Sequence, residues 1–211
     1  MRARRLAKIA AVTDRTLMMN DGFSRLESLA NKFRQRLYVV IREKDLDAKP
    51  LLKFSQQIVE ITAQYESKVL INSRADVALS LTPKAGVHLP ENGIPFSLAR
   101  SIMGEDTLVG RSVHDQQGAQ AAVQAGADYL FIAPVFSVPG KGPALGVDGL
   151  RRIVDGIPER IPVFALGGIS RENVFLLRGL VDGVASIRGI WRNDLAPALE
   201  NLISVSPPVP T

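Results

Sequence analysis

Short apolar runs rich in Val, Ile and Leu recur along this 211-residue chain, and their number constrains the fold more than any other feature. Most runs are nearly continuous rather than alternating in polarity, which is typical of strands covered on both faces, as in a parallel sheet. Eight such runs occupy residues 8–14, 36–41, 68–72, 86–89, 107–113, 128–135, 162–168 and 183–190. A sheet of eight parallel strands is therefore expected.

Amphipathic patterns separate these runs. In residues 51–66, Leu51, Phe54 and Ile58 recur at steps of three or four, as on one face of a helix. Similar patterns cover residues 115–125, 146–156, 170–180 and 195–204. Strand then helix, repeated about eight times in this length, predicts a single (β/α)₈ TIM barrel. A doubly wound open sheet is the alternative, but it normally has fewer strands, and no GxGxxG turn follows the first run.

The length is that of one domain, so residues 1–211 are expected to form a single barrel. Residues 1–7 are interpreted as a basic N-terminal arm and residues 205–211 as a proline-rich C-terminal tail. Most of the formal charge of +5 comes from basic residues in the first eight positions. Elsewhere no aromatic residues are interleaved with basic ones, as a stacking surface for nucleic acid requires. No nucleic-acid partner is expected.

The chain has no cysteine, which excludes disulfides, thiolate metal sites and a cysteine nucleophile. The same absence fits a reducing compartment. The apolar run after the basic arm ends at Thr13, too short for a signal peptide, and no run approaches the roughly 20 apolar residues of a membrane span. We therefore expect a cytoplasmic protein without membrane contact.

In a TIM barrel the catalytic and binding residues collect at the C-terminal ends of the strands. Gly167 and Gly168 end the seventh run, where small residues let the backbone approach a ligand, and Ser170 can cap the next helix. Arg188 and Gly189 follow the core of the eighth run, and the guanidinium adds a forked cation. These residues predict a phosphate site. Alternatively, the glycines only form a tight turn and Arg188 pairs with a nearby acid.

Further substrate-binding candidates come from other strand ends. Lys141 lies in loop 137–146, whose length and Gly/Pro content fit a lid over an anion, although an ordinary surface loop is the alternative. Arg42 and Lys44 can face the barrel mouth together while Glu43 turns away, because strand side chains alternate in direction. A solvated charge run is the other interpretation of those three residues.

The chain has two histidines. His114 follows the fifth run, and an imidazole at such a strand end can take and return a proton near neutral pH or can be merely structural. His88 lies inside a short run and is interpreted as structural or as supporting the site from behind. Asn72, at the end of the third run, joins the substrate-binding candidates. No HExxH pattern or carboxylate pair accompanies the histidines, so neither a metal nor a cofactor is expected.

Taken in order, several segments resemble those of the superfamily of (β/α)₈ barrels that contains thiamine phosphate synthase and thiazole tautomerase (TenI). The resemblance covers essentially the whole chain and is specific for the superfamily, but it does not by itself choose the branch. The segments are AVTDR (11–15), IREK (41–44), LINSRADVAL (70–79), GVHLP (86–90), GRSVH (110–114), AGADYLFIAPVF (125–136) and FALGGIS (164–170).

Departures from the synthase pattern indicate the branch. Where the resemblance implies a pyrimidine-binding glutamine and two magnesium-binding aspartates, this chain has Val40, Ser73 and Gly93. The resemblance also implies two threonines before Lys141, and this chain has Val138 and Gly140 at those positions. A synthase ionises a pyrimidine pyrophosphate, and a leaving diphosphate without its metal faces a large electrostatic penalty. The departures therefore disfavour the synthase reaction.

The GRSVH segment is similar to that of the tautomerase branch, so the resemblance implies that His114 is the proton-transfer residue. It also implies a phosphorylated thiazole as substrate, 2-carboxy-4-methylthiazole ethyl phosphate in its non-aromatic ylidene form. The chain is thus predicted to be a metal-independent isomerase of thiamine biosynthesis. Two alternatives stay open: a divergent synthase, a transferase that recruits Mg²⁺ through acids such as Glu91, and a non-catalytic thiazole-phosphate-binding relative. The sequence also leaves open whether the chain forms a homodimer.

Overall fold

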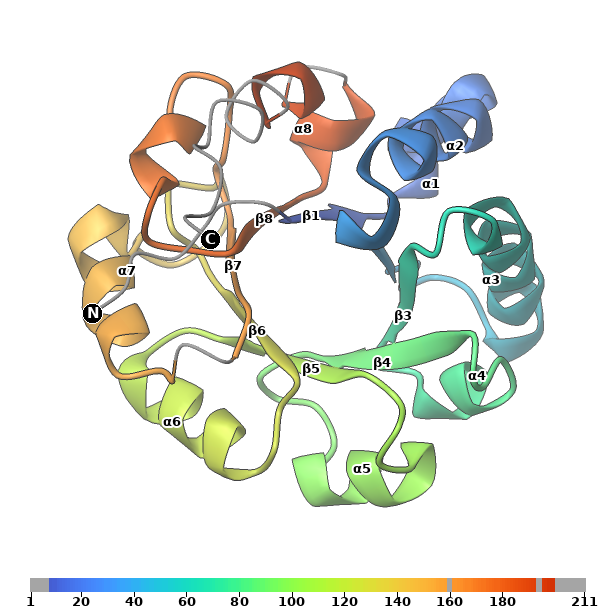
Figure 1. The fold of residues 1–211 in the computed structure, drawn as a ribbon, viewed down its shortest axis with the longest axis horizontal. Helices are drawn as coiled ribbons and strands as arrows, with labels where there is room; N and C mark the ends of the chain where they lie inside the picture. Colours follow the sequence, from blue (N-terminus) through green and yellow to red (C-terminus); the bar gives the residue numbers. More distant parts are fainter. Residues whose placement is uncertain (1–7, 159–160, 193–194, 200–211) are drawn as a thin grey trace, which may run out of the picture.

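Eight parallel strands close into a barrel in the computed structural model, which describes residues 8–158, 161–192 and 195–199 (Figure 1). Every strand pairs with the next one in the sequence, and β8 pairs with β1 through Lys8 and Gly183. The strands are β1 (Lys8–Val12), β2 (Leu37–Ile41), β3 (Lys68–Asn72), β4 (Ala85–Leu89), β5 (Val109–Val113), β6 (Tyr129–Ile132), β7 (Val163–Leu166) and β8 (Gly183–Ser186). The prediction of a single (β/α)₈ barrel is confirmed.

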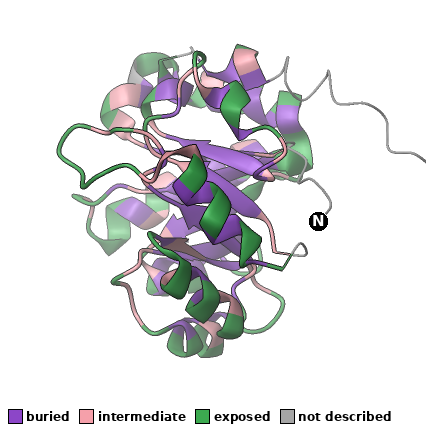
Figure 2. Ribbon diagram, turned by 90° about the vertical axis from the view of Figure 1, so that its left-hand side faces the viewer, coloured by how far each residue is buried: buried purple, intermediate pink, exposed green. Residues whose placement is uncertain are grey.

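Helices surround the barrel and bury their apolar faces against it (Figures 1 and 2). Among the described helices, none combines the length and the apolar character needed to cross a membrane. The basic arm at residues 1–7 and the tail at residues 205–211 lie outside the described residues. The helical elements are α1 (Arg15–Met18), η1 (Met19–Asp21), α2 (Gly22–Phe33), η2 (Arg34–Arg36), α3 (Ala48–Ala63), α4 (Ala75–Leu79), α5 (Phe96–Met103), α6 (Gln116–Gln124), α7 (Gly146–Asp155), η3 (Val174–Leu177) and α8 (Arg188–Trp191).

The helices expected at 51–66, 115–125 and 146–156 correspond to α3, α6 and α7. The α-helix expected at 170–180 is wrong, because this segment contains turns and only the short 3₁₀ helix η3. Asn173 explains the difference: its side chain accepts from the N–H of Ser170 and donates to the carbonyl of Gly168, which offers the backbone an alternative to helical hydrogen bonds. Of the helix expected at 195–204, residues 196–199 are helical and residues 200–204 lie outside the described part.

The last apolar run, residues 183–190, contains two elements rather than one strand. β8 ends at Ser186, and α8 begins at Arg188. The hydroxyl of Ser186 accepts from the N–H of Gly189 at 3.2 Å, and a Cβ on Gly189 would lie 3.0 Å from that hydroxyl oxygen. Arg188 therefore stands at the start of a short helix and not on the strand.

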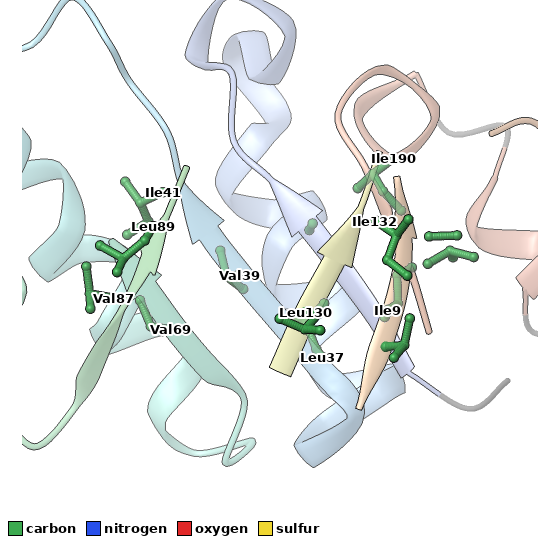
Figure 3. Packing of buried hydrophobic residues seen from close by; sticks show 14 of the residues in the cluster. Ile9, Leu37, Val39, Ile41, Val69, Val87, Leu89, Leu130, Ile132 and Ile190 are labelled. Carbon is green, nitrogen blue, oxygen red and sulfur yellow. The ribbon is translucent and has the colours of Figure 1, made fainter. Parts of the chain in front are cut away.

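The strands separate two apolar cores. Side chains on the outer face of the sheet pack under the helices, among them Ile9, Leu37, Val39, Ile41, Val69, Val87, Leu89, Leu130 and Ile132 (Figure 3). The second core fills the barrel with Ala10, Val12, Tyr38, Val40, Leu70, Tyr129, Phe131, Phe164 and Ala185. Because both faces are buried, each strand is apolar almost without interruption, which is the pattern seen in the sequence.

Two glycines make room for aromatic rings inside the barrel. A Cβ on Gly110 would lie 2.0 Å from the ring of Tyr129, and a Cβ on Gly183 would lie 2.5 Å from the ring of Phe164. The rings also contact one another, with centroids of Tyr129 and Phe164 6.0 Å apart. This aromatic layer closes the barrel interior beneath the C-terminal ends of the strands.

Candidate active site

His114 lies immediately after β5, at the C-terminal end of the barrel, and its side chain is about half exposed. Its Nδ1 is hydrogen-bonded to the carbonyl oxygen of Ala133, the residue after β6. A carbonyl oxygen can only accept, so Nδ1 carries a hydrogen and, in the neutral ring, Nε2 keeps a free lone pair. The backbone thereby fixes the tautomer in which Nε2 can accept a proton.

Glu91 faces this free nitrogen from the loop between β4 and α5. Its Oε2 lies 3.6 Å from Nε2 of His114. The loop is held in place by Arg111, whose Nη2 donates to the carbonyl oxygen of Glu91 at 2.7 Å. The Ala133 carbonyl and the Glu91 carboxylate thus face the two ring nitrogens of His114.

Glu43 separates the two cations expected at the end of β2. Its carboxylate accepts from the hydroxyl of Thr13 at 2.6 Å and from the backbone N–H of Arg15 at 3.2 Å, and it is buried. Arg42, half-buried, precedes it, and Lys44, exposed, follows it. Glu43 thus links the segments that follow β1 and β2, and it lines the same cavity as Lys44.

Lys44 and Asn72 meet at a cavity of about 260 Å³ at the ends of β2 and β3. Asn72 donates from Nδ2 to the hydroxyl of Ser73 at 2.8 Å. Arg42 is not among the residues that line this cavity. A second cavity, of about 370 Å³, opens between α5 and α6, with Glu91, Arg111 and Ser112 in its wall.

Gly167 and Gly168 both have positive φ, at 100° and 65°. A Cβ on Gly167 would lie 2.9 Å from Pro134, and a Cβ on Gly168 would lie 2.6 Å from the carbonyl oxygen of Ser137. These glycines therefore allow the end of β7 to approach the loop after β6 closely. The contact accounts for both glycines without a ligand, while Gly168 also remains exposed and accessible.

Arg188 and Lys141 are exposed, and within the described residues neither side chain forms an ion pair. The pairing of Arg188 with a neighbouring acid, the alternative to phosphate binding, is thus not seen in this part of the chain. The N–H of Gly189 is already donated to Ser186, which leaves it less available to an anion. Lys141 stands on the loop between β6 and α7.

The two positions at which the synthase pattern implies magnesium-binding carboxylates lack them in this chain. Ser73 and Gly93 stand where the synthase pattern has aspartates, and the Ser73 hydroxyl accepts from Asn72. Throughout the described residues, no group of three or more His, Asp or Glu side chains could hold a metal ion. His114 and Glu91 make only a pair.

His88 is buried inside the barrel, where its ring hydrogen-bonds to the Tyr129 hydroxyl and the Ser112 hydroxyl, both at 2.9 Å. Burial lowers the pKa of His88 to about 3, so this ring is neutral at ordinary pH. The sequence suggests its structural role but not its two partners. Ser112 could have been noticed beforehand, since it stands two positions before His114 and strand side chains alternate.

A family model described as thiamine monophosphate synthase matches residues 9–190. The chain belongs to the thiamine monophosphate synthase family. Within the family, the chain is 31% identical over 198 residues to the thiamine-phosphate synthase of Caldanaerobacter subterraneus, covering 92% of this chain and 90% of the relative. It is 39% identical over 175 residues to the putative thiamine-phosphate synthase of Geobacter sulfurreducens, covering 81% of each.

A solved family structure has the same fold over nearly the whole chain. It is described as thiamine phosphate pyrophosphorylase from Pyrococcus furiosus. The two chains are 28% identical, the TM-score is 0.78, and the match covers 93% of this chain and 97% of the other. These comparisons confirm the superfamily expected from the sequence, and the relatives carry the synthase name, not the tautomerase name.

Proposed function

We propose that this family member acts on a phosphorylated thiazole at the barrel mouth, and that His114 transfers the proton that makes the thiazole ring aromatic. The observation that carries this thiazole tautomerase proposal is the geometry of His114. Its Nδ1 is held by the Ala133 carbonyl, and its Nε2 is free and faces Glu91 at 3.6 Å. A general acid/base needs this arrangement, in which one nitrogen is oriented and the other can exchange a proton.

In this reaction Nε2 takes a proton from one position of the non-aromatic ring and returns a proton to another. The composition of the substrate does not change, so no oxidant and no second substrate are needed. The positive charge on the imidazolium is stabilised by Glu91 between the two steps. The energy gained when the ring becomes aromatic drives the reaction forward.

The substrate phosphate is proposed to bind near the ends of β7 and β8. Gly168 and Arg188 are exposed there, and an unpaired guanidinium is a strong ligand for phosphate oxygens. Gly167 and Gly189 shape the backbone around them. Around the rest of the mouth, the remaining candidates for substrate contact are Arg42, Lys44, Asn72 and Lys141.

The comparisons favour a second candidate, thiamine phosphate synthase, over the tautomerase. Relatives 31% and 39% identical to this chain are named as synthases, so similarity alone supports a transferase better than an isomerase. That reaction joins a pyrimidine pyrophosphate to a thiazole phosphate and releases diphosphate. The argument against it is that Ser73 and Gly93 stand where the synthase pattern implies magnesium-binding aspartates. A non-catalytic thiazole-phosphate-binding relative is the third candidate.

Two assays with the purified protein separate these candidates. In the first, the ylidene tautomer is added with EDTA, and its conversion to the aromatic carboxythiazole phosphate is followed. In the second, pyrimidine pyrophosphate, thiazole phosphate and Mg²⁺ are supplied, and thiamine phosphate is measured. We expect turnover in the first assay only. Turnover confined to the second assay overturns the tautomerase in favour of the synthase, and inactivity in both, with thiazole phosphate bound, identifies a binding protein.

The cytoplasmic location, the independence from metal and cofactors, and the absence of nucleic-acid and membrane partners stay predictions. Whether the chain forms a homodimer is equally untested.

A further inference from the structure

Arg111 occupies a position on β5 where the other strands carry apolar side chains. Side chains alternate between the two faces of a strand, and Val109 and Val113 pack in the core between the sheet and the helices. Arg111 lies midway between these two residues, so it points outward from the barrel. In the strand register it lies opposite Leu89 on β4 and Leu130 on β6, which are both buried. A guanidinium group therefore stands between two apolar strands, under the helices.

The guanidinium of Arg111 has more donors than the protein uses. It carries five N–H groups and a permanent positive charge. One N–H, on Nη2, donates to the backbone carbonyl oxygen of Glu91 at 2.7 Å. Among the described residues this side chain forms no other hydrogen bond and no ion pair. In that part of the chain a half-buried cation thus has one neutral partner, which leaves donors for an anion.

Arg111 lines the cavity of about 370 Å³ between α5 and α6, which cover β5 from outside the barrel (Figure 1). A cavity of this volume can hold a small molecule. Ser112 also borders the cavity, but its hydroxyl is bonded to His88 inside the barrel, and His114 does not line it. The cavity is therefore separate from the proposed site of proton transfer. Most of its remaining wall is apolar or small, formed by Phe96, Val113, Gly118, Ala121, Ala122 and Ala125.

We infer that this cavity binds a small organic carboxylate with an apolar body, held at its charged end by Arg111. The planar guanidinium matches the two oxygens of a carboxylate. The buried side chains of Phe96, Val113 and Ala122 offer the apolar surface against which the body of the ligand packs. Because binding here involves neither His114 nor the proposed phosphate ligands, it does not depend on the proposed function.

Glu91 limits the charge of this ligand. Its carboxylate stands where the cavity approaches His114: Oε2 lies 3.6 Å from Nε2 of His114, and a Cβ on Gly118 would lie 3.5 Å from Oε1. In the described part of the chain no ion pair joins this carboxylate to Arg111. A second negative charge on the ligand would be repelled by Glu91, so a monocarboxylate fits better than a phosphate or a dicarboxylate.

Calorimetric titration with benzoate tests the role of the charge, with benzamide as a neutral molecule of nearly the same shape. The wild type should bind benzoate about 10- to 100-fold more tightly than benzamide, the usual contribution of a hydrogen bond to a charged group. In Arg111→Met, which keeps an unbranched side chain without the charge, this preference should disappear. The control Arg151→Met, on the exposed face of α7, should keep it. A wild type that does not bind benzoate, or an Arg111→Met protein that retains the preference, overturns the inference.

NMR of alanine methyl groups in the wild-type protein locates the ligand. Benzoate should shift the signals of Ala121 and Ala125 on α6 and leave unchanged that of Ala133, whose carbonyl binds His114 at the mouth. Glu91→Gln should tighten benzoate binding about two- to fivefold, because a partly screened repulsion is removed. An unchanged affinity in this variant would contradict the restriction to one negative charge. Shifts confined to Ala133 place benzoate at the barrel mouth and overturn the inference, whereas inactivity in the tautomerase assay does not affect it.

Discussion

The two histidines of this chain lie on neighbouring parts of the barrel but in opposite surroundings. His88 is inside the strands, 3% exposed, and both of its nitrogens contact hydroxyl groups. His114 is one step beyond the end of β5, about half exposed, with one nitrogen on a carbonyl and the other near a carboxylate. The same side chain is thus a fixed neutral connector in the interior, and at the mouth it is the residue that we propose to exchange a proton. Depth in the barrel, not residue type, separates the two roles.

The largest effect should come from removing the imidazole at the mouth. His114→Ala is expected to lower kcat for the ylidene substrate by roughly 10²- to 10⁴-fold, the usual contribution of a positioned general acid/base. His114→Asn should be nearly as damaging, because an amide cannot exchange a proton at neutral pH. Steady-state kinetics measures the loss of kcat, and a titration of substrate binding should show that the affinity is nearly unchanged. A large loss of affinity with kcat retained would assign His114 to binding instead.

The interior histidine can be disturbed through Gly110 without touching the mouth. In Gly110→Ala the new Cβ overlaps the Tyr129 ring, and such overpacking should lower the unfolding free energy by about 2–3 kcal/mol. Urea denaturation measures the loss. Gly142→Ala, where a Cβ meets nothing within 4 Å, is the control and should change stability little. Equal stability of the two variants would show that Tyr129 is not confined by the barrel.

The dependence of the unfolding free energy on pH tests whether His88 is neutral in the folded protein. Because burial lowers the pKa of His88 from 6.5 to about 3, the unfolded chain binds a proton in this range that the folded protein does not. The unfolding free energy should therefore be fully present above pH 6.5 and fall by about 1.4 kcal/mol for each pH unit below it, as far as pH 3. Denaturation of wild type and His88→Gln at several pH values measures this contribution as the difference between their slopes. Parallel slopes would contradict a neutral buried ring.

The smallest effect concerns the partner of the mouth histidine. Glu91→Gln removes the charge that faces Nε2 and keeps the size of the side chain. Since the pair is 3.6 Å apart and partly exposed, solvent screens much of the interaction, and kcat should fall only about two- to fivefold. Asn92→Ala next to it on the exposed loop is the control. A loss as large as that of His114→Ala would make Glu91 itself a proton-transfer group.

The barrel could be predicted from the sequence because strands buried on both faces leave continuous apolar runs, and all eight runs contain a strand. Errors arose where side chains compete with regular backbone structure. The Asn173 side chain hydrogen-bonds to the backbone within an expected helix, and the Ser186 hydroxyl accepts from the N–H of Gly189 within an expected strand. Residue propensities and hydrophobic periodicity contain no information about such side-chain contacts.

His114 could be placed at a strand end from the sequence, but its surroundings could not be derived. Ala133 is brought beside it by the pairing of β5 with β6, in which Val113 lies opposite Ile132. Glu91 reaches it from the loop after β4. These neighbours are about 20 residues away in either direction, so only the register of a closed barrel defines the site. The same holds for Tyr129, His88 and Ser112, which belong to three different strands.

Chemical rescue tests the role of His114 most directly. His114→Gly removes the ring and leaves space for a small base, so free imidazole added to the variant should restore conversion of the ylidene substrate in proportion to its concentration. The rate should follow the neutral form of the added base, as expected when it replaces the missing proton carrier. A His114→Gly protein that converts the substrate as fast as wild type without imidazole would contradict proton transfer by His114.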